Sequence, residues 1–400
     1  MNTPALRIAL LMHSLNPRGG VVHTLELADA LVQLGHHVTV IAAGHPGQML
    51  FRSTAATLSI ANLPMGNACA DAQSLVDKVR ARIQAVTEHL RTIDLNSFDV
   101  LHSQDSITAN ALTQMKCEGR IQRFARTVHH LDNFNEPQLA TWQARGVQEA
   151  GQLMCVSALW QGILRQEWHR HADLVGNGVN LQRFQPARGT AQVEQDMQTL
   201  RRLGMCPDHP YWLAVGGIEQ RKNTTRLLHA FAQLMHEAPS TRLVIAGGAS
   251  LLEHTTARQA FEAARASHGM AAGQPFSDRL VLMGPLPDDV LPALYRQAIA
   301  LVMPSVKEGF GLVAIEAMAC GTPAIVSRIA PFTEHLGAQE VIFADPFDID
   351  NLAQALRQSL DAHQHARVAG QARKVAARFD WMSSARRHLQ IYQQHIHSHA

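Results

Sequence analysis

Cysteine and long apolar runs are both scarce in this sequence. The 400 residues contain five cysteines, and no two of them form a C-x-x-C pair. Such scattered cysteines disfavour a disulfide framework and a structural zinc site, and they favour a reducing compartment. No apolar run reaches the length of a transmembrane helix, and the N-terminus lacks the basic region and the cleavage site of a signal peptide. We therefore expect a cytoplasmic protein.

An excess of charge of one sign is lacking as well. The formal net charge is +2, with 46% hydrophobic and 17% charged residues, so the composition gives no electrostatic reason for a nucleic-acid partner. One helical pattern, residues 75–93, carries basic side chains that could lie on an anionic membrane. Because Asp77 and Glu88 interrupt this basic face, we favour a solvated helix over peripheral membrane contact.

Short apolar runs alternate with longer helical patterns along the whole chain. The predicted strands are residues 7–13, 38–42, 99–102, 125–129, 153–157 and 173–175, and then 212–215, 243–246, 280–283, 300–303, 324–326 and 341–343. The alternation predicts an α/β fold with parallel sheets covered on both faces. Proline and glycine interrupt the pattern near 184–208, and the length favours two domains. We expect doubly wound, Rossmann-like domains at 1–185 and 186–380, with ligands at the carboxyl ends of the strands and in the cleft between the domains.

The most informative segment runs from Glu308 to Glu316. An apolar run, residues 300–303, precedes it, a Gly-x-Gly turn (Gly309 to Gly311) follows Glu308, and a helical pattern begins at Leu312. A strand, a glycine turn and a helix in this order direct backbone N–H groups and the positive helix end at one point, which suits a phosphate. The two carboxylates can accept hydrogen bonds from hydroxyl groups. The segment therefore indicates a sugar nucleotide.

A second basic segment follows the first strand of the second half. Arg221 and Lys222 stand in a loop behind the glycine pair Gly216-Gly217. A planar guanidinium and a compact ammonium can together neutralise a diphosphate. Taken alone, the pair is more simply a solvated basic turn before a helix. Beside the Glu308–Glu316 segment, we interpret it as a diphosphate clamp.

Gly19 and Gly20 open a helix after the first strand of the chain. Their N–H groups could approach a phosphate or a sugar, or the pair could only serve a tight turn, and the sequence leaves both interpretations open. The fingerprint G-x-G-x-x-G is absent here, which disfavours a dinucleotide cofactor.

Two other groups of polar residues follow predicted strands. His129 ends a strand of the first half, where it could bind a sugar hydroxyl or assist proton movement, and its neighbour His130 leaves open which imidazole faces the cleft. Asp348 and Asp350 have the spacing of a metal-binding carboxylate pair. They open a helical pattern, however, and aspartate there is favoured by capping. We predict a structural role for them and no metal site.

These motifs, in this order, carry a resemblance that covers nearly the whole chain. The sequence resembles the retaining glycosyltransferases of the large family 4, which have the GT-B fold. The segments that carry the resemblance are 217–223, 283–287 and 304–323 in the second half, and Gly19-Gly20, 27–40 and 176–180 in the first. The resemblance implies two domains facing each other across a cleft and a final helix, residues 381–400, that crosses back to the first domain.

The resemblance also implies roles for the individual residues. Arg221 and Lys222 would clamp the donor diphosphate, Glu316 would hold the ribose hydroxyls, and Glu308 would contact the transferred sugar. His129 resembles the family's histidine near the C6 hydroxyl of the sugar. The remaining positions expected at the donor are Gly19, Gly20, Gly217, Gly284, Gly309, Phe310, Gly311 and Leu312.

The implied reaction is sugar transfer from a nucleoside-diphosphate sugar to an acceptor that the sequence does not identify. No metal or other cofactor is expected, since the fixed cations would neutralise the leaving diphosphate. Two alternatives stay open at this point. The first is different chemistry on the same architecture, such as a sugar-nucleotide epimerase or an inverting transferase, and the second is a sugar-nucleotide binder without catalysis.

Overall fold

The computed structural model describes residues 4–64, 74–248 and 255–397, and it divides the chain into two compact units. Unit 1 comprises Met1–Gly178 and Asp380–Ala400, and unit 2 comprises Val179–Phe379. The domain bounds expected from the sequence are 1–185, 186–380 and 381–400. Residues 398–400 of the expected last helix lie outside the described residues.

Unit 1 is built on a seven-stranded sheet in the order β3-β2-β1-β4-β5-β6-β7. All neighbouring strands are parallel. The strands are β1 (Arg7–Met12), β2 (His37–Gly44), β3 (Thr57–Asn62), β4 (Val100–Ser103), β5 (Ala125–Val128), β6 (Gln152–Cys155) and β7 (Asp173–Leu174). The helices are α1 (Gly19–Gln33), α2 (Leu75–Thr92), α3 (Ser106–Cys117), α4 (Pro137–Gln148), α5 (Ala158–Gln166) and α14 (Trp381–His397), with a short 3-10 turn at Leu95–Ser97.

Unit 2 is built on a six-stranded parallel sheet in the order β10-β9-β8-β11-β12-β13. The strands are β8 (Tyr211–Val215), β9 (Arg242–Ala246), β10 (Leu280–Gly284), β11 (Ala300–Met303), β12 (Ala324–Ser327) and β13 (Ile342–Ala344). The helices are α6 (Thr190–Arg202), α7 (Thr224–Leu234), α8 (Thr255–Ser267), α9 (Leu291–Gln297), α10 (Leu312–Ala319), α11 (Phe332–His335), α12 (Ile349–Leu360) and α13 (Ala362–Ala376), with a 3-10 turn at Asp288–Val290.

The central strands explain why the sheets are covered on both faces. In β4 and β11 every residue is buried, and in β1 only Arg7 is exposed. Strands buried on both faces read as continuous apolar runs, which is why the sequence predicts them well. The prediction of two doubly wound parallel sheets is confirmed, and each predicted strand overlaps an observed one.

The sequence does not predict β3, at the edge of the first sheet. Of its six residues, Thr57–Asn62, only one is fully buried, and they mix polar with apolar side chains. An edge strand covered on fewer sides needs no apolar run.

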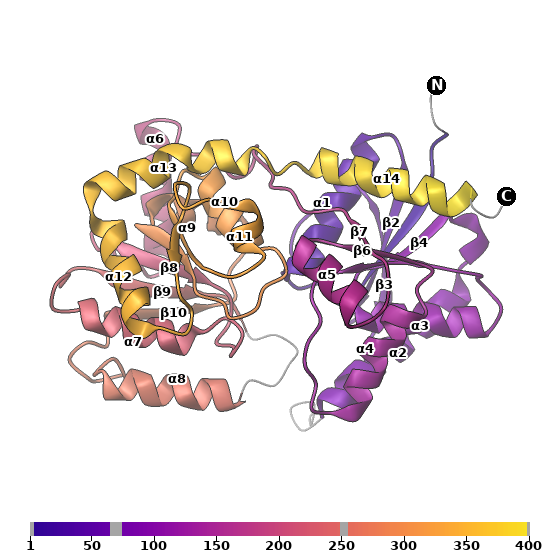
Figure 1. Cartoon of the computed structure of the whole chain (residues 1–400), viewed down its shortest axis with the longest axis horizontal. Helices are drawn as coiled ribbons and strands as arrows, with labels where there is room; N and C mark the ends of the chain where they lie inside the picture. Colours follow the sequence, from indigo (N-terminus) through magenta and orange to yellow (C-terminus); the bar gives the residue numbers. More distant parts are fainter. Residues whose placement is uncertain (1–3, 65–73, 249–254, 398–400) are drawn as a thin grey trace. The chain divides into compact units, whose positions relative to one another are not determined.

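Helices α2 and α14 show how unit 1 is covered. Helix α2 packs beside α3 and β3, and its charged residues Asp77, Arg80 and Glu88 are exposed. No described helix combines the length and hydropathy that spanning a membrane requires. Helix α14, the yellow C-terminal helix, packs against α1 (Figure 1).

Candidate functional site

The loops that follow β8 and β11 lie next to each other because these two strands are neighbours in the sheet of unit 2. In a parallel sheet, adjacent strands end at the same edge. The two loops are tied by a backbone hydrogen bond of 2.9 Å from Val306 N–H to the Arg221 carbonyl oxygen. The fold therefore brings Arg221 and Lys222 to the segment that contains Glu308.

The carboxylate of Glu308 accepts hydrogen bonds from both cations, Arg221 and Lys222. Its Oε2 lies 2.9 Å from Lys222 Nζ and 3.3 Å from Arg221 Nη1. The side chains are largely buried, with exposures of 16% for Lys222 and 12% for Glu308. Arg221 also reaches Glu219, whose Oε2 lies 3.4 Å from Nη2. The sequence pattern did not single out Glu219.

The balance of charge keeps Glu308 ionised. Burial by itself raises the pKa of this carboxyl, but Lys222 and Arg221 outweigh burial and lower the pKa to about 2. An opposite charge within hydrogen-bonding distance favours the ionised form of a carboxyl. At neutral pH Arg221 and Lys222 therefore share the ionised carboxylate of Glu308, and Arg221 also faces Glu219.

Asn223 and Gly216 support the two cations from behind. Asn223 has φ of 60°, and its buried amide donates to the carbonyl oxygens of Pro304 at 3.0 Å and Pro346 at 2.6 Å. It thereby fastens the loop after β8 to two other loops of the same edge. A Cβ added at Gly216 would lie 3.4 Å from Lys222 Cε, so the lysine stem packs on this glycine. Neither contact is readable from the local sequence.

The glycine turn before α10 is confirmed. Gly311 has φ of 97° and caps the helix, which begins at Leu312. A Cβ at Gly311 would lie 2.4 Å from Phe332 Cε1, so both the backbone conformation and the space require glycine. The Phe310 ring stacks on His335 with a centroid distance of 4.8 Å. The turn is thus fixed on both sides, and the N-terminus of α10 follows the Glu308 loop directly.

Glu316 lies on the second turn of α10, as predicted, and is 8% exposed. Its Oε2 accepts a hydrogen bond of 2.9 Å from the hydroxyl of Tyr295 on α9. Burial raises the pKa of Tyr295 well above its ordinary value, and Glu316 raises it further. The hydroxyl therefore stays protonated and donates to the carboxylate. Tyr295 fixes Glu316, a contact that the sequence pattern does not indicate.

Three other predicted glycines lie on this unit. Gly217 follows β8, and Gly284 ends β10 with φ of 64°. In the sheet, β9 separates β10 from β8, so Gly284 belongs to the same edge but not to an adjacent loop. The N–H of Gly309 donates to Glu308 Oε1 at 3.1 Å, which directs this amide at the carboxylate of the preceding residue.

Gly19, Gly20 and His129 belong to unit 1. Gly19 and Gly20 open α1, and His129 directly follows β5. A Cβ added at Gly20 would lie 3.3 Å from His129 Cδ2, so this glycine lets the first turn of α1 approach the imidazole. The sequence does not predict this contact between Gly20 and His129.

The two histidines after β5 have different surroundings. The Nε2 of His129 lies 3.1 Å from Gln104 Oε1, and its ring packs edge-on against His23. His130 Nε2 lies 3.5 Å from the carboxylate of Asp132. His129 is therefore held by the core of unit 1, whereas His130 is held by a neighbouring loop residue.

The carboxylate pair on α12 has the structural role that its sequence predicts. Asp348 caps the helix by accepting from the N–H of Asn351 at 3.1 Å, and Asp350 accepts from the side chain of Gln233. Across the described ranges, no group of three or more histidine, cysteine, aspartate and glutamate side chains is arranged to hold a metal ion.

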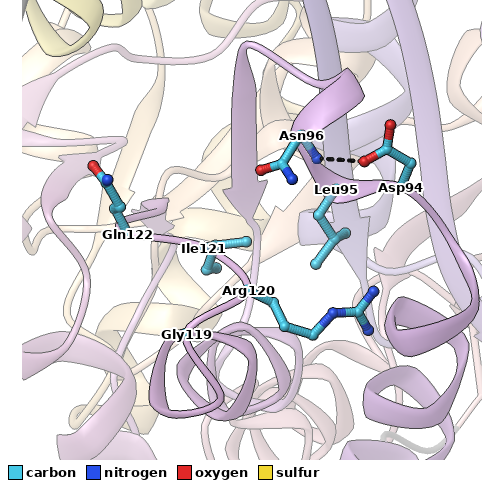
Figure 2. A pocket seen from close by; sticks show the side chains of 7 residues that line it. All are labelled: Asp94, Leu95, Asn96, Gly119, Arg120, Ile121 and Gln122. Atoms are coloured by element: carbon cyan, nitrogen blue, oxygen red, sulfur yellow. Dashed lines mark hydrogen bonds between the residues drawn. The ribbon is translucent and has the colours of Figure 1, made fainter.

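A hollow of about 420 Å³ lies on unit 1, and none of the residues described above lines it (Figure 2). It is lined by Asp94, Leu95, Asn96, Gly119, Arg120, Ile121 and Gln122. These segments lead into β4 and β5, so the hollow lies at the amino ends of the strands. Ligands of such sheets bind at the opposite, carboxyl edge, where His129 lies.

Two family models match the chain, one on each side of residue 190. The model described as Glycosyltransferase Family 4 matches residues 17–183, and the model described as Glycosyl transferases group 1 matches residues 200–375. Together they cover most of both units.

Curated relatives match about half of the chain. A D-inositol 3-phosphate glycosyltransferase of Streptomyces bingchenggensis is 34% identical over 225 residues, which cover 55% of this chain and 47% of that protein. A protein of the same name from Frankia alni is 34% identical over 229 residues, which cover 55% and 52%. The chain thus spans about half the length of the curated relatives it matches.

Solved structures match the chain over nearly its full length. Sucrose-phosphate synthase from Thermosynechococcus elongatus has a TM-score of 0.77 at 22% identity, covering 98% of this chain and 100% of that one. HepE of Anabaena, in complex with UDP and glucose, has a TM-score of 0.72 at 16% identity, covering 96% and 98%. At these identities the likeness establishes the fold.

Proposed function

Because the chain belongs to the glycosyltransferases of family 4 and group 1, with the GT-B fold, we propose that it transfers a sugar from a nucleoside-diphosphate sugar with retention of anomeric configuration. The observation that carries the proposal lies in unit 2. Two cations and a glycine-capped helix N-terminus flank one ionised carboxylate, Glu308, at the ligand-binding edge of the sheet. Positive charge and helix N-terminal amides suit a diphosphate, and carboxylates suit sugar hydroxyls.

In the proposed donor complex, Arg221 and Lys222 contact the diphosphate while Glu308 turns one or both of its oxygens to the transferred sugar. Glu316, fixed by Tyr295, holds the ribose hydroxyls. The amides of Phe310, Gly311 and Leu312 reach the sugar and phosphate. Gly217, Gly284 and Gly309 complete the donor contacts of unit 2.

The proposed chemistry is electrostatic. As the bond between the anomeric carbon and the phosphate oxygen breaks, negative charge grows on the diphosphate. Preorganised cations stabilise such charge better in the transition state than in the ground state. In this proposal Arg221, Lys222 and the N-terminus of α10 stabilise the leaving diphosphate, and the reaction proceeds without a resident metal. The acceptor hydroxyl attacks the same face, and its proton passes to the leaving phosphate.

From unit 1, we propose that His129 contacts a hydroxyl of the transferred sugar and that Gly19 and Gly20 contribute backbone contacts. We also place the reaction in the cytoplasm. Among the described residues, Cys117, Cys206 and Cys320 form no disulfide, which fits a reducing compartment.

The test is nucleotide release from UDP-, GDP- and ADP-sugars, with D-inositol 3-phosphate among the acceptors because the curated relatives carry that name. Glu316→Ala should reduce release while the far-UV circular dichroism spectrum stays that of the parent. An α-linked product from an α-configured donor supports retention, and a β-linked product means inversion. Thermal stabilisation by a nucleotide without turnover of any donor would indicate a binder instead.

A further inference from the structure

His129 lies at one end of a chain of polar side chains that runs through the interior of unit 1. Gln104 follows β4 and is 3% exposed, while His102 in β4 and Tyr392 in α14 are 0% exposed. His102 and Gln104 belong to one segment, whereas Tyr392 lies 290 positions from His102. Buried polar groups of this kind are costly unless they are paired, so the order of the hydrogen bonds is informative.

Tyr392 holds the far end of the chain. Burial raises the pKa of its hydroxyl far above the ordinary value, so the hydroxyl remains protonated and can donate. Its oxygen lies 2.6 Å from His102 Nδ1, and His102 Nε2 lies 2.9 Å from Thr127 Oγ1. When Tyr392 donates to Nδ1, His102 carries its proton on Nε2 and donates to the threonine.

Gln104 packs its amide nitrogen against the His102 ring and meets His129 with its oxygen. Its amide nitrogen lies 3.3 Å from His102 Nδ1 and 3.4 Å from Nε2, and its Oε1 lies 3.1 Å from His129 Nε2. An amide oxygen only accepts, so His129 must carry a proton on Nε2. Burial, together with His23, His130, His102 and Arg126, lowers the pKa of His129 well below its ordinary value. The ring is therefore neutral, with its single proton on Nε2.

We propose that Tyr392, His102 and Gln104 are positioning residues, which hold His129 as the Nε2–H tautomer and leave Nδ1 as the nitrogen that accepts a hydrogen bond from a substrate hydroxyl. The tautomer and its control follow from unit 1 alone, whereas the substrate hydroxyl rests on the proposed function. Gly20 belongs to the same arrangement, because a side chain there would push on the His129 ring. Through Tyr392, the C-terminal helix α14 thereby influences which ring nitrogen of His129 carries the proton.

The direct test is nitrogen-15 NMR of the full chain with labelled histidine. The ring signals of His129 are assigned as those lost in His129→Asn. We expect the Nε2–H tautomer in the parent chain. Gln104→Met removes the amide oxygen, and the tautomer should become a mixture with Nδ1–H. Tyr392→Phe removes only a hydroxyl and should loosen the tautomer of His102 first and that of His129 partly.

The matched control is Gln161→Met, which removes a partly buried hydrogen bond of 2.8 Å from the glutamine amide to the Ala172 carbonyl in the same unit. This variant should leave the His129 signals unchanged. A parent chain with His129 as Nδ1–H, or identical His129 signals in the parent and both Gln104→Met and Tyr392→Phe, would overturn the proposal.

A second readout connects the tautomer to turnover. Gln104→Met should lower kcat/KM for donor turnover roughly 3- to 10-fold, the effect of one hydrogen bond, with the nucleotide-induced thermal shift retained. If the parent turns over no donor, the proposed function fails while the NMR result still decides the tautomer. An unchanged kcat/KM in Gln104→Met with an altered tautomer would refute the link to the substrate.

Discussion

Lys222 and Arg221 share one carboxylate, and this sharing determines how each is expected to respond to substitution. Without a donor, Glu308 neutralises part of the positive charge. A diphosphate has to compete for the same two side chains or bind beside the carboxylate. The short contact to Lys222, 2.9 Å against 3.3 Å for Arg221, makes the lysine the more strongly coupled partner.

We predict that Lys222→Ala lowers kcat/KM for nucleotide release about 10- to 100-fold. One charge-assisted hydrogen bond contributes about 1.5–3 kcal/mol, and about 1.4 kcal/mol corresponds to a factor of ten in rate. The matched control is Lys116→Ala, which removes an ammonium from an exposed ion pair with Glu149 on unit 1. Exposed pairs contribute little, so its release rate should equal that of the parent. If Lys222→Ala and Lys116→Ala release nucleotide at equal rates, the role of Lys222 in a diphosphate clamp is rejected.

Tyr295→Phe tests the support of Glu316. The substitution removes the hydroxyl that donates to Glu316 Oε2 at 2.9 Å and keeps the ring in the core. We expect nucleotide affinity to weaken roughly 3- to 10-fold, because the carboxylate loses one fixed hydrogen bond. Isothermal titration with UDP, GDP and ADP measures this. As a control, Tyr211→Phe removes a buried hydroxyl that donates to the Leu294 carbonyl and should leave affinity unchanged, so a similar loss in both would point to the core rather than the site.

At the scale of elements, the site depends on two turns that follow neighbouring strands. The turn after β8 is fastened by Asn223, and the turn after β11 is closed by Gly311 against Phe332. The backbone conformation of each turn is held by contacts with other loops. Changes in these turns should therefore affect folding and binding together.

We predict that Gly311→Ala lowers the free energy of unfolding of unit 2 by about 1–3 kcal/mol, the cost of a residue held in a sparsely populated backbone conformation. The added Cβ would also meet Phe332 at 2.4 Å. Gly19→Ala is the matched control, because a Cβ there meets nothing within 4 Å at the start of α1, and alanine in a helix is favourable. Urea unfolding should show a loss for the first variant and none for the second. A parent-like midpoint for Gly311→Ala would contradict this account of the turn.

Local patterns predict the elements of this chain better than they predict its contacts. The strand before Glu308, the glycine turn and the helix with Glu316 follow from periodicity and glycine placement, and all three are observed. The roles of Tyr295 and Gln104 could not be predicted in the same way. Periodicity shows that a residue is buried, but not which residue it meets, and these contacts span 21 and 25 positions. Edge strand β3 was not predicted because its residues are only partly buried and form no apolar run.

At the scale of the whole chain, the interior of unit 1 contains several buried histidines. Unit 1 buries a cluster of neutral imidazoles between α1, β4, β5 and α14. The ring of His23 packs on His129, Trp381 and His388, and His23 and His388 are 0% exposed. An imidazole that is buried without a charged partner resists protonation. The cohesion of unit 1, including the docking of α14, should consequently depend on pH.

The direction of this dependence follows from linkage. Burial lowers the pKa of His23 from 6.5 to about 4 and that of His388 to about 3. Since both values lie below those of the unfolded chain, the unfolded state takes up protons first as the pH falls. The stabilisation is complete above about pH 6.5 and is lost progressively toward pH 4, by up to about 1.4 kcal/mol per pH unit for each such histidine.

We predict that amide protection in α1 and α14 declines between pH 6.5 and pH 4, and that His388→Leu makes this decline shallower by about 1.4 kcal/mol per pH unit. The measurement is hydrogen exchange by mass spectrometry, corrected for the intrinsic exchange rate at each pH. His363→Leu, which replaces an exposed histidine on α13, should leave the slope unchanged. The stability that the ionised Glu308 carboxylate contributes is lost in a different pH range. Because its pKa is lowered to about 2, this loss occurs below about pH 4.5. Equal slopes in the parent and His388→Leu would mean that the buried imidazoles do not control the docking of α14.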